Sequence, residues 1–363
     1  MKKTIRILFI APHRPERSPS QRFRIEQFFN TIKSKGYTYD YSWLISEKED
    51  AQFYANGYFI TKVFLIIKYF LKRCIDVYNA NNYDIIFIQR EAFFMGPPIF
   101  EYLFHKSSAK IIYDFDDSIW LPNVSDGNKK FDKFKYYNKI YKIISYADLV
   151  IAGNSYLASY ANHFNKNVVI ISTVVDTDKY TAIYPKENAS KICIGWSGSS
   201  TTIKHFKYAE EFLNLLKNKY RDNIIIKVVG DASYKNEALD IKGSSWSKET
   251  EVEELNSIDI GIMPLPNDDW SKGKCGLKGL LYMSMGIPAV MSPVGVNNEI
   301  LKNGINGFLA ESDNEWLDKL SLLIDSEELR KKIGAEGLKT VEERYSLNSQ
   351  KSFFIKCIES LVC

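Results

Sequence analysis

Residues 258–308 read IDIGIMPLPNDDWSKGKCGLKGLLYMSMGIPAVMSPVGVNNEILKNGINGF, and this stretch decides the fold more than any other part of the chain. A short apolar run is followed by a loop rich in Pro, Asp, Gly and Lys, and then by a helical segment. Gly286-Ile287-Pro288 leads into the next apolar run. This order is typical of the edge of a parallel α/β sheet at which a helix N-terminus and loop amides hold a phosphate.

Apolar runs rich in β-branched residues recur along the chain, with helical segments between them. Continuous rather than alternating hydrophobicity is typical of parallel strands buried on both faces. The length of 363 residues suits two domains, and the polar stretch 178–190 is the expected linker, so we predict domains at 1–180 and 181–345. The runs are residues 5–11, 84–88, 110–113, 149–152 and 168–171, then 192–196, 224–229, 258–263 and 289–291.

The loop that carries Lys274, Cys275, Gly276 and Lys278 gives a family resemblance. With Gly295 further along, it resembles the donor-binding half of family 4 glycosyltransferases, and in particular a divergent bacterial branch with a K-C-G-F-K pattern. The resemblance implies an α/β protein of the GT-B fold, in which two Rossmann-like parallel-sheet domains face a central cleft. It also implies a C-terminal helix, residues 346–363, that packs back on the first domain.

The Glu-x7-Glu acids of that family are missing here: no Glu lies in this loop, and Leu281 stands at the position of the second acid. The second acid commonly binds the ribose of the nucleotide, a hydrogen bond that Leu281 cannot make. Lys274 and Lys278 instead place positive charge where a departing diphosphate would be stabilised. A solvated basic loop is the alternative interpretation.

Two further segments of the second half are expected to contact the donor. The first, GWSGSSTT at residues 195–202, follows a predicted strand and precedes a helix, so its small residues suit phosphate binding or simple N-capping. The second is the turn at Gly295, where Glu299 either binds a sugar hydroxyl or compensates a helix dipole. The predicted donor-binding residues are Gly198, Ser199, Ser200, Thr201, Lys204, Lys274, Cys275, Gly276, Lys278, Gly295, Asn297 and Glu299.

Polar residues also follow the predicted strands of the first half. A Ser/Arg-rich turn enters a helix after the first strand, and Arg90 and Glu91 follow another strand; arginine is a planar, bidentate partner for anions. We expect the acceptor side to include Ser20, Arg22, Arg24, Arg90 and Glu91.

Residues 114–117 read DFDD and invite three interpretations. Carboxylates two residues apart hold a metal in GT-A glycosyltransferases. Here the DFDD carboxylates lie in the half of the chain without the predicted nucleotide-binding loops. We favour Asp116 and Asp117 as catalytic carboxylates that orient an acceptor hydroxyl or act as a base, together with Lys274 and Lys278 on the donor side. Capping of the next helix is the remaining alternative.

Composition limits the partners and the compartment. The five cysteines form no C-x-x-C pair and there are four histidines, so we predict no disulfide framework, no metal site and a cytoplasmic protein. Residues 1–185 contain 25 Lys and Arg against 18 Asp and Glu, which favours an anionic partner. Residues 58–75 predict an amphipathic helix with Lys62, Lys68, Lys72 and Arg73 on its outer face, suited to anionic lipid or to core packing.

The aromatic-basic stretch 129–137 fits the same membrane surface. It would also suit single-stranded nucleic acid, but no nucleic-acid-binding motif accompanies it, so we expect no nucleic-acid partner. The sequence contains no run of eighteen apolar residues, and the protein is expected to be peripheral on the inner face of the plasma membrane if it meets lipid at all.

The resemblance implies a metal-independent, retaining glycosyltransferase of the hexosyltransferase type that needs no cofactor. Its substrates would be a nucleoside-diphosphate sugar and a glycan or lipid-linked acceptor in polysaccharide biosynthesis. Two alternatives remain: a catalytically silent glycosyltransferase-like binding protein, favoured by the missing acids, and a GT-B nucleotide-sugar 2-epimerase.

Overall fold

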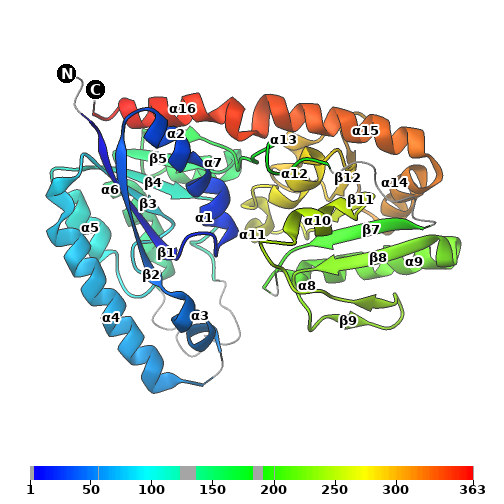
Figure 1. Ribbon diagram of the computed structural model, residues 1–363, viewed down its shortest axis with the longest axis horizontal. Helices are drawn as coiled ribbons and strands as arrows, with labels where there is room; N and C mark the ends of the chain where they lie inside the picture. Colours follow the sequence, from blue (N-terminus) through cyan, green and yellow to red (C-terminus); the bar gives the residue numbers. More distant parts are fainter. Residues whose placement is uncertain (1–3, 56, 123–135, 183–190, 200, 363) are drawn as a thin grey trace. The chain divides into compact units, whose positions relative to one another are not determined.

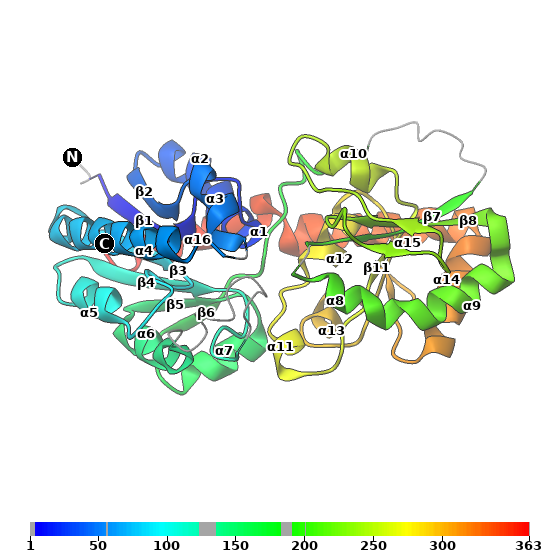
Figure 2. The same cartoon turned by 90° about the horizontal axis from the view of Figure 1, so that it is seen from below.

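The computed structural model describes residues 4–55, 57–122, 136–182, 191–199 and 201–362. The chain divides into two compact units, one of Met1–Thr173 with Gln350–Cys363 and one of Val174–Ser349. Each unit contains a parallel sheet with helices packed along it (Figures 1 and 2). Part of the expected linker and most of the aromatic-basic stretch 129–137 lie outside the described residues.

The first unit is built on a six-stranded sheet of order β2-β1-β3-β4-β5-β6, in which every neighbouring pair is parallel. Its strands are β1 (Arg6–His13), β2 (Thr38–Ile45), β3 (Ile85–Gln89), β4 (Lys110–Phe115), β5 (Leu149–Ala152) and β6 (Val168–Ile170). The helices are α1 (Pro19–Arg24), α2 (Phe29–Ser34), α3 (Glu47–Tyr54), α4 (Phe59–Tyr78), α5 (Ile99–His105), α6 (Ile140–Tyr146), α7 (Ser155–Asn162) and α16 (Leu347–Glu359).

Most of these strands coincide with the predicted apolar runs, but β2 does not. Its burial alternates along its first half because it forms an edge of the sheet, so the search for continuous apolar runs missed it. The C-terminal helix α16 contributes to the core of this unit. The ring of Phe354 stacks on that of Phe28, with centroids 4.0 Å apart, and lies 5.9 Å from that of Phe87.

The second unit is built on a five-stranded parallel sheet of order β13-β12-β11-β7-β8, with a small antiparallel pair, β9 and β10. The strands are β7 (Ile192–Ser197), β8 (Ile224–Val229), β9 (Lys235–Asn236), β10 (Ile241–Lys242), β11 (Ile260–Met263), β12 (Ala289–Met291) and β13 (Phe308–Leu309). The helices are α8 (Ile203–Phe206), α9 (Glu210–Tyr220), α10 (Glu251–Asn256), α11 (Asp269–Lys272), α12 (Leu277–Ser284), α13 (Asn297–Ile300), α14 (Asp313–Asp325) and α15 (Glu327–Thr340).

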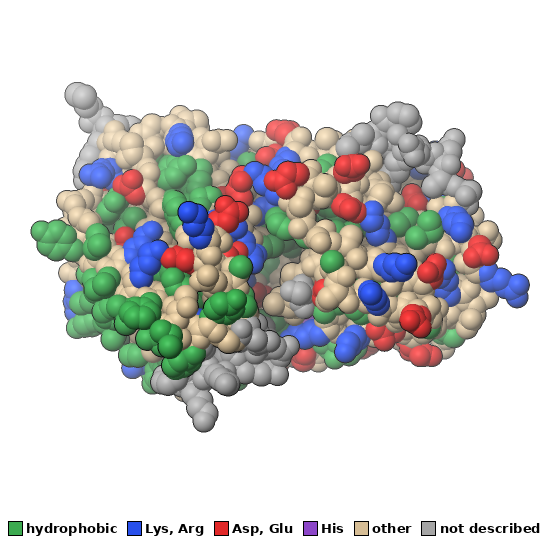
Figure 3. Space-filling view, turned by 60° about the horizontal axis from the view of Figure 1, so that its bottom comes forward, with side chains coloured by type: hydrophobic (Ala, Val, Ile, Leu, Met, Phe, Trp, Pro, Cys, Tyr) green, Lys and Arg blue, Asp and Glu red, His purple; other side chains and the backbone are tan. Residues whose placement is uncertain are grey.

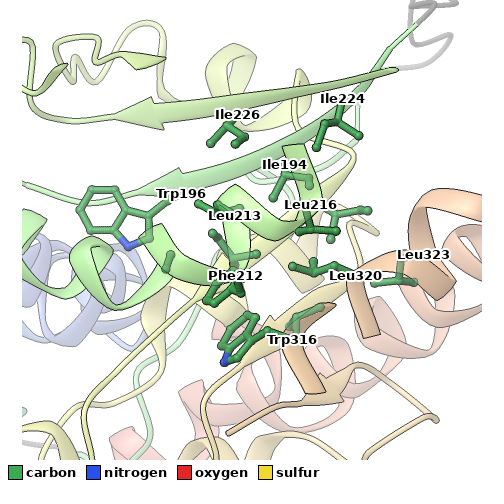
Figure 4. Packing of buried hydrophobic residues seen from close by; sticks show 14 of the residues in the cluster. Ile194, Trp196, Phe212, Leu213, Leu216, Ile224, Ile226, Trp316, Leu320 and Leu323 are labelled. Carbon is green, nitrogen blue, oxygen red and sulfur yellow. The ribbon is translucent and has the colours of Figure 1, made fainter. Parts of the chain in front are cut away.

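The core of the second unit lies between the sheet and the helices α9 and α14 (Figure 4). The rings of Phe212 and Trp316 stack in parallel, with centroids 4.5 Å apart, and join the two helices. Trp196 points into this core from the end of β7. The sheet is therefore a rigid base for the loops that follow β7, β11 and β12.

The prediction of a basic outer face on residues 58–75 is wrong for Lys62 and Arg73, whereas Lys68 is exposed and Lys72 is half-buried. Lys62 and Arg73 are buried, and the guanidinium of Arg73 donates hydrogen bonds to the carbonyl oxygens of Ala92 and Ala11 at 2.6 and 2.8 Å. Asp76 pairs with the same guanidinium at 2.6 Å. The neighbouring backbone therefore satisfies these cations inside the unit, and the outward face of α4 is apolar.

Candidate functional site

The loop after β7 is held by close backbone contacts. The amide of Gly198 donates to the carbonyl oxygen of Val229 at 2.9 Å. Gly230 follows β8 with φ of +115°, and a Cβ there would lie 1.9 Å from the carbonyl oxygen of Gly198. Both positions therefore require glycine, and the loops after β7 and β8 meet without side chains between them.

The hydroxyl groups of the same loop bond to one another. The Ser199 amide donates to Oγ1 of Thr202 at 2.9 Å, and the hydroxyls of Ser199 and Thr201 lie 2.9 Å apart. No side-chain cap was found at the start of α8, which is only four residues long. The described side chains therefore do not cap helix α8, contrary to the N-capping alternative. Ser200 lies outside the described residues.

The loops after β11 and β12 also depend on glycine. Gly276 begins α12 with φ of +71°, and a Cβ there would lie 2.4 Å from Cδ1 of Ile300. Gly295 has φ of +54°, and a Cβ there would lie 2.6 Å from the carbonyl oxygen of Lys272. The two loops are thus packed against each other at the carboxyl ends of neighbouring strands, while Cys275 is buried beside them.

Three lysines of this edge lie close enough to one buried histidine to affect its pKa. The ammonium of Lys274 lies 5.2 Å from the ring centre of Trp270, and that of Lys278 lies 5.1 Å from that of Trp196. Burial, and then the positive charges of Lys278, Lys274 and Lys204, together lower the pKa of His205 from 6.5 to about 4. The imidazole is therefore neutral at pH 7, and the surrounding field attracts anions.

The last predicted donor residues lie on and beside α13. Asn297 is buried, and its amide nitrogen donates to the carbonyl oxygen of Ser292 at 2.9 Å. Its Oδ1 accepts no hydrogen bond from any described residue and lies 3.7 Å from the position that a Cβ on Gly276 would take. A buried acceptor beside the Gly276 turn is suited to a ligand donor group. Glu299 is exposed in the first turn of α13.

Tyr282, which the sequence did not single out, joins α12 to the β7 loop. Its hydroxyl accepts a hydrogen bond from the amide of Ser197 at 2.8 Å. Its ring fills the space above Gly261, where a Cβ would lie 2.2 Å from Cδ2. The helix that carries Lys278 therefore also fixes the start of the loop with Gly198.

Ion pairs dominate the carboxyl edge of the first sheet. Arg24 and Asp114 are both buried and paired, with Nε of Arg24 3.2 and 3.3 Å from the carboxylate oxygens, and Arg24 also donates to the carbonyl oxygen of Ile171. The ammonium of Lys139 lies 2.6 Å from the carboxylate of Glu91. These contacts give Arg24 and Glu91 a structural role in the unit.

Asp116 and Asp117 share one arginine. Nε of Arg90 donates to Oδ1 of Asp116 at 2.8 Å, and Nη2 of Arg90 pairs with Asp117. The hydroxyl of Ser20 donates to Asp116 at 2.7 Å and accepts from the side chain of Gln89 at 2.6 Å. Arg90 itself has φ of +63°, an uncommon conformation for a non-glycine residue that recurs at functional sites.

The charges around Asp116 decide its ionisation. Burial raises the pKa of Asp116, but the charge and hydrogen bonds of Arg90, with smaller contributions from Arg24 and Ser20, outweigh burial and lower it. Asp116 is therefore a carboxylate at neutral pH and a weak base. This favours orientation of a hydroxyl over proton abstraction.

A histidine that the sequence analysis passed over ends β1 nearby. The main-chain amide of His13 donates to Oε1 of Gln21 at 2.9 Å, and Nε2 of Gln21 donates to the carbonyl oxygen of His13 at 2.7 Å. Burial first, and then the charge of Arg17, lower the pKa of His13 to about 4. The chain contains only four histidines. The sequence could have indicated these two, because His13 lies at the end of a strand and His205 lies beside the Ser/Thr loop.

The described residues contain no group of three or more His, Cys, Asp or Glu side chains arranged to hold a metal ion. In the DFDD segment, Asp114 is paired with Arg24, and Asp116 and Asp117 are paired with Arg90. The guanidinium groups occupy the carboxylate oxygens that a cation would need. The predicted acceptor residue Arg22 is buried beside the ring of Phe23.

Part of the chain matches a known protein family, and nearly the whole chain matches solved structures. Residues 191–326 match the family model described as Glycosyl transferases group 1. The chain has the GT-B fold. It matches a glycosyltransferase from Rickettsia africae ESF-5 (18% identity, TM-score 0.68, 99% of each chain) and Anabaena HepE in complex with UDP and glucose (13%, 0.68, 98% of this chain and 100% of that one). It also matches sucrose-phosphate synthase from Thermosynechococcus elongatus (11%, 0.68, 98% and 99%). No curated protein matches the chain.

The group 1 domain includes every residue predicted for the donor side, from Gly198 to Glu299. The residues predicted for the acceptor side all precede it. Leu281 is buried in α12 of this domain and offers no polar group.

Proposed function

We propose that this protein is a glycosyltransferase of the hexosyltransferase type, related to family 4, that transfers a sugar from a nucleoside-diphosphate sugar to a growing polysaccharide or glycolipid, with retention of the anomeric configuration. The gathering of Lys204, Lys274 and Lys278 around neutral His205 carries the proposal. A diphosphate held there would be stabilised as its leaving oxygen gains negative charge. The UDP-glucose complex of HepE makes uridine nucleotides the first ligands to test.

In this proposal the second unit binds the donor and the first unit orients the acceptor. On the donor side, the glycines of the loops after β7 and β12 let backbone amides approach the phosphates, and Oδ1 of Asn297 accepts a hydrogen bond from the ligand. On the acceptor side, the carboxylate of Asp116, fixed by Arg90, orients the attacking hydroxyl. The glycan or lipid-linked acceptor is required for turnover.

The buried side chain of Leu281 supports a second candidate, a binding protein that holds the nucleotide sugar without turning it over. The experiment that separates them is release of nucleoside diphosphate from a panel of nucleotide sugars, with and without glycan acceptors, combined with calorimetric titration of the nucleotides. Release that depends on an acceptor supports the transferase. Binding without release supports the silent protein, isomerisation without acceptor supports a 2-epimerase, and failure to bind any nucleoside diphosphate overturns the donor site.

A further inference from the structure

Helix α4 presents its apolar side chains to solvent along its whole length. Phe59, Ile60, Phe64, Ile67, Leu71 and Ile75 are all exposed, and Ile60 and Phe64 keep 72% and 68% of their accessible surface. The spacing of residues 60, 64, 67, 71 and 75 places them on one side of a helix about 30 Å long. An exposed apolar strip of this length marks an interaction surface.

The neighbouring helix α5 widens this strip. It lies beside α4 and exposes Ile99, Tyr102 and Leu103. Figure 3 shows hydrophobic side chains gathered over the part of the first unit where α4 and α5 lie. We call the exposed apolar side chains of α4 and α5 the α4–α5 face.

The acidic side chains of α4 and α5 turn away from the α4–α5 face. The acidic residue of α4, Asp76, bonds inward to Arg73 and Ser42, and that of α5, Glu101, is buried and accepts from the amide of Ala92. The exposed basic side chains of the two helices are Lys68 on α4, which pairs with Glu49 of α3, and His105 and Lys106 at the end of α5. The face therefore offers apolar contact with positive charge at its margins.

We propose that the α4–α5 face docks the protein on a lipid bilayer, with α4 lying in the plane of the interface and its apolar side chains inserted among the headgroups. Lys106 reaches anionic lipid phosphates at the margin. Two-fold pairing with a second copy would instead bring like charges together, which a bilayer avoids. None of the helices among the described residues is long and apolar enough to cross a membrane, so this attachment is peripheral.

This proposal does not depend on the proposed transferase activity, because donor binding lies in the other unit. It replaces the docking mode expected from the sequence, in which Lys62 and Arg73 faced the lipid. The driving contribution is now insertion of apolar side chains, and the charges add selectivity for anionic lipid. Binding should therefore persist partly at high salt, where purely electrostatic adsorption would be lost.

The test is flotation of the full chain with phosphatidylcholine vesicles and with vesicles of equal parts phosphatidylcholine and phosphatidylglycerol. The wild type should float with both and more strongly with the anionic vesicles. The triple variant Phe64→Gln, Ile67→Gln, Leu71→Gln should reduce partitioning more than about tenfold. A matched control, Tyr208→Gln, Ile305→Gln, Leu322→Gln, removes three comparably exposed apolar side chains of the second unit and should leave flotation unchanged.

Cys74 supplies an independent probe, because it is exposed on α4 while the other cysteines of the described chain are buried. With Cys363 changed to Ser, an environment-sensitive fluorophore on Cys74 should shift to shorter wavelength when vesicles are added. Nucleotide-induced thermal shifts verify that the triple variant is folded and keep this test separate from that of the catalytic proposal. Undiminished flotation of the triple variant, an unchanged probe, or a dimer that the triple variant disperses while wild type ignores vesicles would overturn the proposal.

Discussion

At the carboxyl edge of the first sheet, arginines neutralise the carboxylates beside them, whereas at the same edge of the second sheet lysines gather around a neutral histidine. Arg24 and Arg90 are tied to Asp114, Asp116 and Asp117 by direct ion pairs. The lysines of the second sheet lie against tryptophan rings, and together they depress the pKa of His205. The two sheets share an architecture, but the carboxylates at one edge are held in ion pairs, whereas the other edge attracts an anion.

Breaking the buried pair of the first edge should give the largest effect on stability. Arg24→Met leaves the carboxylate of Asp114 buried without its partner, and we expect a loss of about 3–5 kcal/mol in the free energy of unfolding. Urea titration measures it. Arg17→Met, which removes an arginine from a more exposed ion pair with Asp50, is the matched control and should cost less than about 1 kcal/mol. Equal effects of the two changes would show that burial does not distinguish these pairs.

At the second edge, the expected effect is on affinity. Lys274→Ala and Lys278→Ala should each weaken nucleoside-diphosphate binding by about 10- to 100-fold, because a charge-assisted hydrogen bond to phosphate contributes about 1.5–3 kcal/mol. Lys272→Ala is the control: its ammonium lies 3.1 Å from Asp269, and affinity should change less than about twofold. Calorimetry provides the measurement, and unchanged affinity in both Lys274→Ala and Lys278→Ala would remove the donor assignment.

Both edges share a buried histidine, and pH tests this similarity. The pKa values of His13 and His205 fall from 6.5 to about 4 in the folded protein. Between these values the unfolded chain binds protons that the folded chain does not, so stability should decrease as the pH falls from about 6.5 to about 4. Each histidine contributes about 2 kcal/mol to this loss after allowance for solvent screening.

His13→Gln and His205→Gln should each flatten part of this pH dependence, measured by urea titration across that range. The two contributions should add, because the histidines lie in separate units. If the double variant retains the full pH dependence of the free energy of unfolding, other titratable groups cause that dependence.

The smallest expected effect concerns metal. Arg90 engages Asp116 and Asp117, and the proposed donor loop carries Lys274 and Lys278. Acceptor-dependent release of nucleoside diphosphate should therefore change less than about twofold in excess EDTA. A complete loss that Mn²⁺ reverses would make the DFDD carboxylates metal ligands and would end the contrast between the two edges.

Local pattern predicted the sheets well and the side-chain partners poorly. Strands such as β3 are buried on both faces and read as continuous apolar runs, whereas the edge strand β2 alternates. The sequence predicted the same acceptor-side role for Arg22 and Arg24. It could not show that Arg24 pairs with Asp114, because that partner is ninety positions away. Hydrophobic periodicity on α4 identified two faces but not which one turns inward, since the carbonyl groups that bind Arg73 come from β1 and from the residues after β3.

The helix α12 determines the spacing of the donor edge. Its first turn carries Lys278, and one turn later Tyr282 covers Gly261 and holds the amide of Ser197. Adding or removing one residue would rotate the helix surface by about 100° and separate these contacts. Homologous chains should therefore tolerate substitutions between Gly276 and Gly286 far better than changes in length, and insertions should collect in the loops on either side.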